Sequence, residues 1–389
     1  MRMQRIASAA VIAVGLLAAP GTAQAAEEWT QVAPAFTWPD RHFADVEGTG
    51  DGGAWAVGFQ RTKYVSVPTG ISPDASQIVL LDVPPKPVLQ RFDGTKWKNV
   101  ATHGLDGDGA LQDVDAVSAS DVWISGYRHT NGREGTTYLA HWDGTKWNTV
   151  DPPAPFERAR RRQLSAEADA LWLMEDGKVS RRKDGAWTTY ELGDVWDLDT
   201  YPSGGAWAQG GRWLRHFDGT AWKSIAPPPG GFGPVFHATG PDTGWTAAGS
   251  GLARWDGSSW TTTPYPAGYK GGGTSSNADP SGPWVQVIPE EPTYEDKEMN
   301  LHWDGSSWQR FPSAPLPTAG TAQGDLWTVM DAPLGSSDYY LHRWNGTAWV
   351  RDHPGSQAFR NIRLTALPGG LLATGQDKNG NVRAFTTSD

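Results

Sequence analysis

A short segment that recurs along the whole chain constrains the fold more than any other feature. Each copy carries Asp-Gly or Asn-Gly and closes on a Trp; the closing residues are Trp97, Trp147, Trp187, Trp222, Trp260, Trp308 and Trp349. The spacing of 35 to 50 residues is typical of propeller blades or of a solenoid. Asp-Gly between alternating apolar runs predicts a tight hairpin, because both residues accept a positive φ.

A second element, also centred on Trp, lies about twenty residues before each turn. Its members are Trp55, Trp123, Trp172, Trp207, Trp245, Trp284 and Trp327. A shorter alternating run, such as residues 111–117, precedes it. Each unit therefore predicts four short antiparallel strands, named a to d in chain order, and such sheets repeated around an axis form a propeller.

The two ends of the chain decide the number of blades. Residues 361–366, 371–375 and 382–385 match strands a, b and c, but no Trp strand follows them. The missing strand is present near the N-terminus, where residues 28–32 match residues 96–100. We therefore predict an all-β fold: a single propeller of eight four-stranded blades, closed by the N-terminal strand. Seven blades with a loose C-terminal extension is the alternative.

The first 25 residues have the pattern of a bacterial secretory signal peptide. A short basic start precedes the apolar run 6–19, and Ala23-Gln24-Ala25 supplies a small-residue cleavage site. The propeller domain is then expected to span residues 26–389 of a secreted, extracellular protein. No later segment is apolar enough for membrane insertion.

Composition narrows the possible partners. Loss of Arg2 and Arg5 with the signal peptide takes the formal net charge from −10 to −12, which argues against a nucleic-acid partner. The chain has no Cys, so packing and ring closure must replace disulfides. We expect a monomer.

At these repeated residues the chain resembles the secreted, Trp-rich propellers of the kelch/galactose-oxidase-like superfamily. The turn is also similar to the Asp-box (BNR-like) hairpin of sialidase-type propellers, in which Ser or Thr, Asp, Gly and an aromatic residue form a folded turn between strands c and d. The resemblance covers nearly all of the chain after the signal peptide and implies a propeller.

The repeated polar residues favour a structural interpretation over a functional one. The turn Asp and Trp could bind sugars, but sevenfold repetition at fixed register favours an Asp that caps its own turn and a Trp that packs between blades. The residue before each turn aromatic is Arg or His: Arg91, His141, Arg182, His216, Arg254, His302 and Arg343. We expect these side chains to stack on a neighbouring Trp, and we predict neither a metal ion nor another cofactor.

Function is expected where the repeat breaks down. In an up-and-down blade the c–d turns lie on one face, and the b–c and d–a connections lie on the opposite face. These connections vary in length and composition, and ligand-binding residues concentrate on such loops. The candidate ligand-binding residues are Tyr127, Arg128, His129, Arg158, Arg160, Arg161, Arg162, Tyr269, Lys270 and Tyr294.

Propellers of this kind serve three classes of function. The first is a non-catalytic extracellular propeller that binds a glycan, a cell-wall polymer or a protein. The second is a glycoside hydrolase or lyase of sialidase-like type, for which no catalytic residue can be assigned. The third, an oxidase like the copper enzymes of the superfamily, needs a Cys-modified Tyr and is excluded by the absence of Cys. We favour the binding protein.

Overall fold

The computed structural model describes most of the chain after the predicted signal peptide. The described residues are 29–36, 42–60, 65–68, 76–79, 85–105, 107–130, 133–153, 162–175, 177–202, 204–276, 278–279, 281–291, 299–312, 315–320, 325–331, 339–352, 354, 359–377 and 380–387. The predicted signal peptide, residues 1–25, lies outside them. No helix long and apolar enough to cross a membrane occurs in these ranges.

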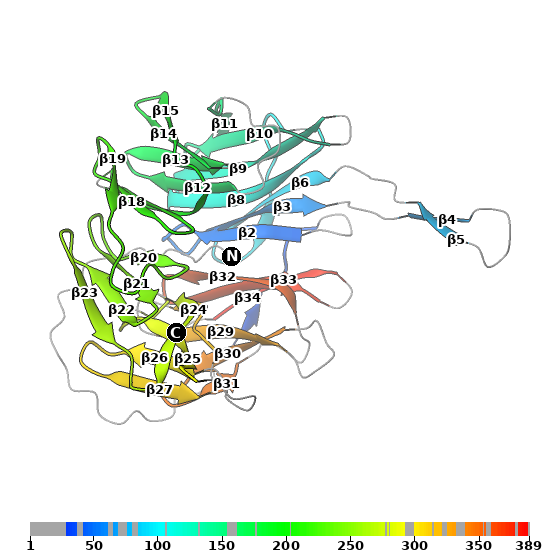
Figure 1. Ribbon diagram of the computed structural model, residues 1–389. Helices are drawn as coiled ribbons and strands as arrows, with labels where there is room; N and C mark the ends of the chain where they lie inside the picture. Colours follow the sequence, from blue (N-terminus) through cyan, green and yellow to red (C-terminus); the bar gives the residue numbers. More distant parts are fainter. Residues whose placement is uncertain are drawn as a thin grey trace.

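Eight four-stranded antiparallel sheets form a ring, as the repeat predicts (Figure 1). Blade one contains β2 (His42–Gly48), β3 (Ala54–Gln60), β6 (Lys86–Phe92) and β7 (Trp97–Asn99). Blade two contains β8 (Gly109–Ser118), β9 (Asp121–Thr130), β10 (Arg133–Trp142) and β11 (Trp147–Thr149). Blade three contains β12 (Arg162–Glu167), β13 (Ala170–Glu175), β14 (Lys178–Lys183) and β15 (Ala186–Glu191). Blade four contains β16 (Val195–Thr200), β17 (Ala206–Gly210), β18 (Leu214–Phe217) and β19 (Trp222–Ile225).

The second half of the ring repeats this order. Blade five contains β20 (Phe236–Ala238), β21 (Gly244–Ala248), β22 (Gly251–Trp255) and β23 (Trp260–Pro264). Blade six contains β24 (Tyr269–Ser276), β25 (Trp284–Pro289), β26 (Met299–Trp303) and β27 (Trp308–Pro312). Blade seven contains β28 (Ala319–Gly320), β29 (Leu326–Asp331), β30 (Tyr339–Trp344) and β31 (Trp349–Arg351). Blade eight contains β32 (Arg360–Leu367), β33 (Gly370–Gln376), β34 (Val382–Thr386) and β1 (Thr30–Gln31).

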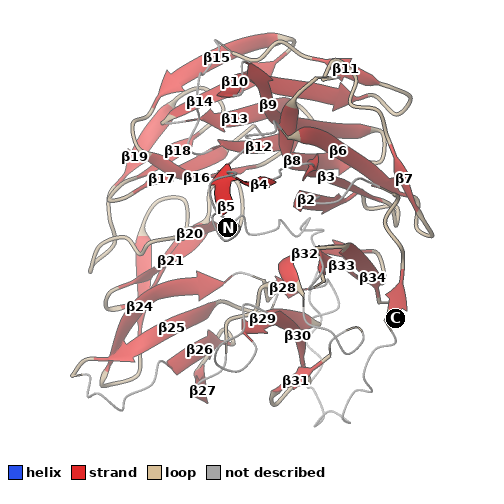
Figure 2. Cartoon of the chain, turned by 90° about the vertical axis from the view of Figure 1, so that its right-hand side faces the viewer, coloured by secondary structure: helices blue, strands red, loops and turns tan. Residues whose placement is uncertain are grey.

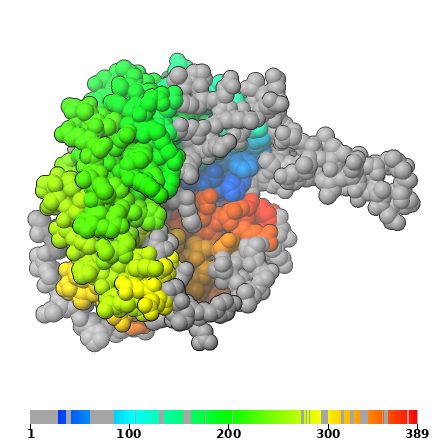
Figure 3. Space-filling view, viewed as in Figure 1, coloured from blue at the N-terminus to red at the C-terminus, as the bar shows by residue number. Residues whose placement is uncertain are grey.

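The N-terminal strand closes the ring. Thr30 pairs with Thr386 and Gln31 with Phe385, and the Val32 amide donates to the Ala384 carbonyl at 2.9 Å. The first and last blades consequently lie against each other, blue beside orange-red in Figure 3. The eight-blade prediction is confirmed, and the seven-blade alternative is wrong, because the last blade is completed by a strand from the other end of the chain.

Strand a is the innermost strand of each blade, and the a strands of blades seven, eight, one, two, three and four contact one another in that order. An inner strand has one unpaired edge, and side chains of the preceding blade bond to it. Asp45 Oδ2 accepts from the Val114 amide at 3.2 Å, and Asp115 Oδ2 accepts from the Ala166 amide at 3.1 Å. These bonds satisfy backbone groups that would otherwise be unpaired in the packed interior.

Trp side chains fill the gaps between blades. The indole of Trp55, fully buried on strand b of blade one, lies 5.1 Å from that of Trp147 on strand d of blade two, measured between ring centroids. Trp172 of blade three packs in the same way against Phe217 and Trp222 of blade four. Aromatic burial of this kind supplies large apolar area and defined geometry, so the repeated Trp residues hold consecutive blades together.

The expected stacking on a neighbouring Trp is confirmed for six of the seven residues: Arg91, His141, Arg182, His216, His302 and Arg343. His141 stacks on Trp123 at 4.2 Å, and the Arg91 guanidinium lies 5.5 Å from the centre of the Trp55 ring. In blade three, Arg181 lies opposite the b-strand Trp172 at 5.3 Å, whereas the Arg182 guanidinium lies 6.0 Å from the ring centre of Trp123 in blade two. A shorter turn causes this shift by one residue.

The turns themselves are of two kinds. In blade three, Asp184 and Gly185 form a two-residue turn with φ of 51° and 83°, as a tight primed turn requires. In the other repeats the aromatic pair that flanks the turn encloses four residues, as between Phe92 and Trp97, and the Gly takes the positive φ while the Asp does not. The prediction of positive φ at both residues is therefore wrong outside blade three.

The ring has two unlike faces. The c–d turns lie on the left in Figure 1, and the b–c and d–a connections lie on the right. Figure 2 looks onto the second face, called the variable face below. The connection between β3 and β6 on this face carries a separate two-stranded hairpin, β4 (Val65–Pro68) and β5 (Ser76–Val79).

Removing the closing strand should destabilise the whole ring. Deletion of residues 26–33 leaves β34 with a free edge, and we expect the melting temperature to fall by about 10 °C or more. Trp29→Phe should cause a smaller fall, since it removes the hydrogen bond from Trp29 Nε1 to Asp352 Oδ1 (3.1 Å) and leaves the strand in place. Calorimetry measures both shifts; an unchanged melting temperature for the deletion contradicts closure by this strand.

A buried histidine should make stability depend on pH. His237 packs beside Trp245, its Nε2 lies 2.9 Å from Ser275 Oγ of the next blade, and burial lowers its pKa from 6.5 to about 3. The unfolded chain takes up a proton that the folded chain refuses, so stability is lost as the pH falls from about 6.5 toward about 3. His237→Gln should show a shallower loss of melting temperature over this range. Equal slopes for the two proteins would rule out this contribution.

Candidate functional site

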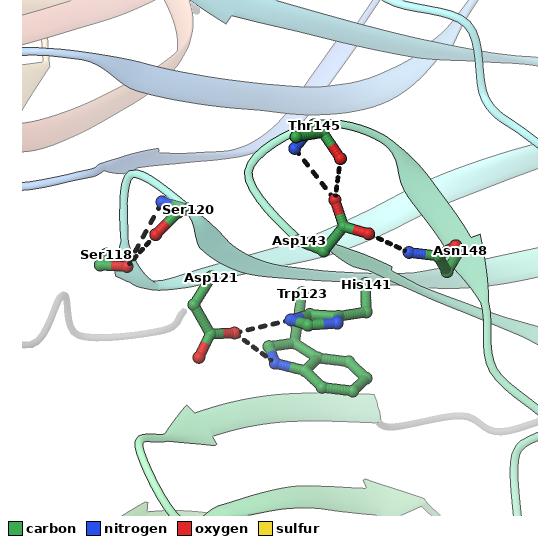
Figure 4. A network of polar contacts seen from close by, with 8 residues as sticks. All are labelled: Ser118, Ser120, Asp121, Trp123, His141, Asp143, Thr145 and Asn148. Carbon is green, nitrogen blue, oxygen red and sulfur yellow. Dashed lines mark hydrogen bonds and ion pairs between the residues drawn. The ribbon is translucent and has the colours of Figure 1, made fainter.

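The turn Asp residues are engaged within their own turns. Asp143 Oδ1 accepts from the Thr145 amide (2.9 Å), the Thr145 hydroxyl (2.6 Å) and the Lys146 amide (3.0 Å), as Figure 4 shows in part. The Thr145 hydroxyl, followed by the Lys146 amide, holds the pKa of Asp143 well below its ordinary range. The same bonds recur at Asp93, Asp218, Asp256, Asp304 and Asn345. The structural interpretation of the repeated Asp or Asn is confirmed at these six turns.

The histidines that stack on Trp are held by carboxylates on the turn side. Asp121 Oδ1 accepts from Trp123 Nε1 at 3.1 Å and contacts His141 Nε2 at 2.8 Å (Figure 4). In blade six Asp279 lies between Trp284 Nε1 (2.7 Å) and His302 Nε2 (3.4 Å). Within the described residues no group of three or more His, Asp or Glu side chains is placed to hold a metal ion.

Three of the predicted ligand-binding residues lie at the variable end of β9. Arg128 donates to the Gly104 carbonyl and lies 5.2 Å from the Tyr138 ring centre, so it ties the preceding connection to blade two. The rings of Tyr127 and His129 are 5.2 Å apart, and His129 Nδ1 is buried with no hydrogen-bond partner. Both rings therefore remain candidates for ligand contact, whereas Arg128 has a structural role.

Arg162 begins β12 and belongs to a buried polar cluster between blades two and three. Its Nε donates to Glu175 Oε1 at 2.6 Å, and its Nη1 donates to Gln112 Oε1 at 2.7 Å. The Thr137 hydroxyl also donates to Glu175 Oε1, at 2.8 Å. The Arg162 and Glu175 side chains are 5% and 1% exposed, and Glu175 Oε2 has no partner. The guanidinium is thus held inside the protein, away from a surface ligand.

The remaining candidates are not gathered at this cluster. Tyr269 and Lys270 begin β24 in blade six, three blades further along the ring, where the Arg310 guanidinium lies 5.9 Å from the Tyr269 ring centre. Arg158, Arg160, Arg161 and Tyr294 lie outside the described residues. Of the ten candidates, Tyr127, Arg128 and His129 lie together on β9, and Arg162 bonds to Thr137, the residue that pairs with Tyr127.

Sequence reasoning missed Trp196, which is the one exposed Trp in the described part of the chain, at 41%. Trp196 occupies a β-bulge on β16, between the pairs Val195–Gly210 and Asp197–Gln209. Bulges turn a side chain away from the regular alternation of a strand. The available signal was that Trp196 lies outside both repeated Trp positions.

Trp196 lies near the Arg162 cluster. The Gln163 side chain bonds to both the amide (3.1 Å) and the carbonyl (2.7 Å) of Leu198, so β12 and β16 run side by side at this point. Arg162 precedes Gln163 by one residue, and Trp196 precedes Leu198 by two. We name Gln112, Tyr127 and Trp196, together with the buried supporting pair Arg162 and Glu175, the inner-rim site; all lie at the variable ends of inner or neighbouring strands in blades two to four.

Comparison with known proteins adds no functional assignment. No protein-family model matches the chain, and no curated protein does at a significant level. Among solved structures, the WD40 domain of SCAP from fission yeast matches at 9% identity, over 93% of this chain and 94% of that chain, with a TM-score of 0.49. The propeller domain of the Trilobed protease from Pyrococcus furiosus matches at 8% identity, over 90% and 94%, with a TM-score of 0.46.

An oligogalacturonate lyase from Vibrio parahaemolyticus is also similar, at 9% identity over 94% of this chain and 97% of that chain, with a TM-score of 0.41. Likenesses of this strength decide nothing about activity. The eight-bladed propeller is established by the sheet topology of the chain itself.

Breaking the buried ion pair on one side should be costly. Arg162→Met leaves Glu175 charged and buried, and Glu175→Leu leaves Arg162 in the same state, so each should lose about 3–5 kcal/mol of stability. The double variant removes both charges and should lose less than either single variant. Denaturant unfolding measures the three values. Additive losses would show that the two side chains do not interact as a pair.

Proposed function

We propose that this chain is a secreted, non-catalytic propeller that binds an extracellular glycan, cell-wall polymer or protein through its variable face. The N-terminal signal-peptide pattern motivates the extracellular location, and the absence of Cys is compatible with it because ring closure secures the ends. Membership of the kelch/galactose-oxidase-like superfamily, and kinship of the turns with the Asp-box, are part of this proposal and rest on the repeated residues alone.

One observation carries the proposal: the two faces differ in how their polar and aromatic side chains are used. On the turn face the repeated Asp and Asn side chains accept hydrogen bonds from amides of their own turns. On the variable face the non-repeated residues of the inner-rim site gather at one side of the ring, and they include an exposed indole. Ligand sites are carried by such irregular positions on a rigid scaffold.

The experiment is a capture assay with the chain from residue 26. Immobilised glycans, cell-wall polysaccharides and extracellular protein extracts are scored for both binding and cleavage. Arg160→Ala with Arg161→Ala removes two cations from the connection that leads into β12, and capture of an anionic partner should weaken several-fold in low salt.

The matched control removes two cations from the opposite face. Lys96→Ala with Lys146→Ala changes the same net charge at two exposed turns and should leave capture unchanged. Equal loss in both variants would indicate a general charge effect. Cleavage of a captured polymer by the purified protein would overturn the non-catalytic assignment and favour a glycoside hydrolase or lyase.

A further inference from the structure

We propose that Trp196 is the stacking platform of a carbohydrate site, on which a pyranose ring of a glycan lies flat. This inference rests on the proposed binding function and names its ligand class and its central residue. It begins from the position of Trp196 in the repeat: the corresponding bulged residues of β2 and β8 are Ala44 and Gln112. Packing of the blades therefore does not require an indole at this position.

The indole is fixed although it is exposed. Trp196 Nε1 donates to Asp194 Oδ2 at 2.8 Å, so its polar edge is anchored to the residue that precedes β16. A side chain held in place before binding loses little conformational entropy when a ligand arrives. An exposed Trp without such a bond would have to be ordered by the ligand itself. The bond to Asp194 therefore favours a role of Trp196 in recognition.

Two glycines leave the space that the indoles of Trp196 and Trp213 occupy. A Cβ at Gly211 would lie 2.9 Å from Trp196 Cζ2, and a Cβ at Gly210 would lie 2.3 Å from Trp213 Cε2. The short connection between β17 and β18 therefore lets two indoles approach its backbone, one on each glycine. Trp213 is half-buried with the Arg215 guanidinium 4.8 Å from its ring centre, so the pair presents Trp196 to solvent from a packed base.

The chemistry around the platform suits a sugar. A pyranose has an apolar face of C–H groups and a rim of hydroxyls, and it needs a flat aromatic surface bordered by polar groups. Trp196 supplies the flat surface. Asp194 is exposed and binds the Nε1 edge of the indole, and Arg212, also exposed, follows Gly211 in the chain. Trp provides a large rigid contact area with a polar edge. A cationic ligand would call for several aromatic walls, and here the second indole is covered by Arg215.

The probes are soluble cello-, manno-, chito- and galacturono-oligosaccharides, titrated calorimetrically into the chain from residue 26. At least one should bind, and Trp196→Ala should weaken that binding about tenfold or more. Trp196→Phe keeps a smaller ring and should retain part of the affinity. Gly211→Ala leaves Trp196 in the chain but displaces its indole, and it should also weaken binding.

Tyr339→Ala is the matched control, since Tyr339 is 37% exposed at the variable end of β30, three blades from Trp196. The Tyr339→Ala variant should bind the oligosaccharide with the affinity of the unmodified chain. Melting temperatures confirm that every variant folds. If no oligosaccharide binds, or if Trp196→Ala binds as tightly as the unmodified chain, the platform is refuted. Capture of a partner that depends on Arg160 and Arg161 but not on Trp196 would leave the binding function intact and remove only the carbohydrate assignment.

Discussion

The unpaired edge of the innermost strand is the constraint on which this propeller depends. Every blade presents such an edge to the axis, and a row of free amide and carbonyl groups there would be costly. Side chains of the preceding blade satisfy these groups. Asp45 and Asp115 each accept from an amide of the next inner strand, and Gln163 accepts from the Leu198 amide and donates to the Leu198 carbonyl. Thr365 does the same for Gly48 across the junction between the last and first blades.

These bonds change how the acidic composition should be interpreted. Asp side chains at the inner strands and in the c–d turns accept backbone hydrogen bonds, so these carboxylates serve the scaffold. Because each such bond spans either one turn or one blade junction, the ring is fastened at many independent points. A chain without Cys can then hold its ends by strand pairing alone, as β1 and β34 do.

The sequence predicts this scaffold well because the relevant information is local and repeated. The four strands of a blade, the aromatic pair at the turn and the stacking of His141 on Trp123 all follow from spacing within one unit. The different Trp partner of Arg182 in blade three has a local cause as well. Asp184 and Trp187 are one residue closer together in the chain than Asp93 and Trp97, and this shortening places Arg181 opposite Trp172.

The site was harder to predict, since its geometry comes from contacts between units. Nothing near Arg162 in sequence shows that Gln112 and Thr137 of the preceding blade enclose its guanidinium, which makes it a buried partner of Glu175 and not a ligand contact. Likewise, the exposure of Trp196 follows from a bulge, which depends on how β16 pairs with β17. Because this chain uses Trp as its standard packing residue, composition does not distinguish Trp196 from the other Trp residues. Only the structure shows that every other described indole is at least half-buried.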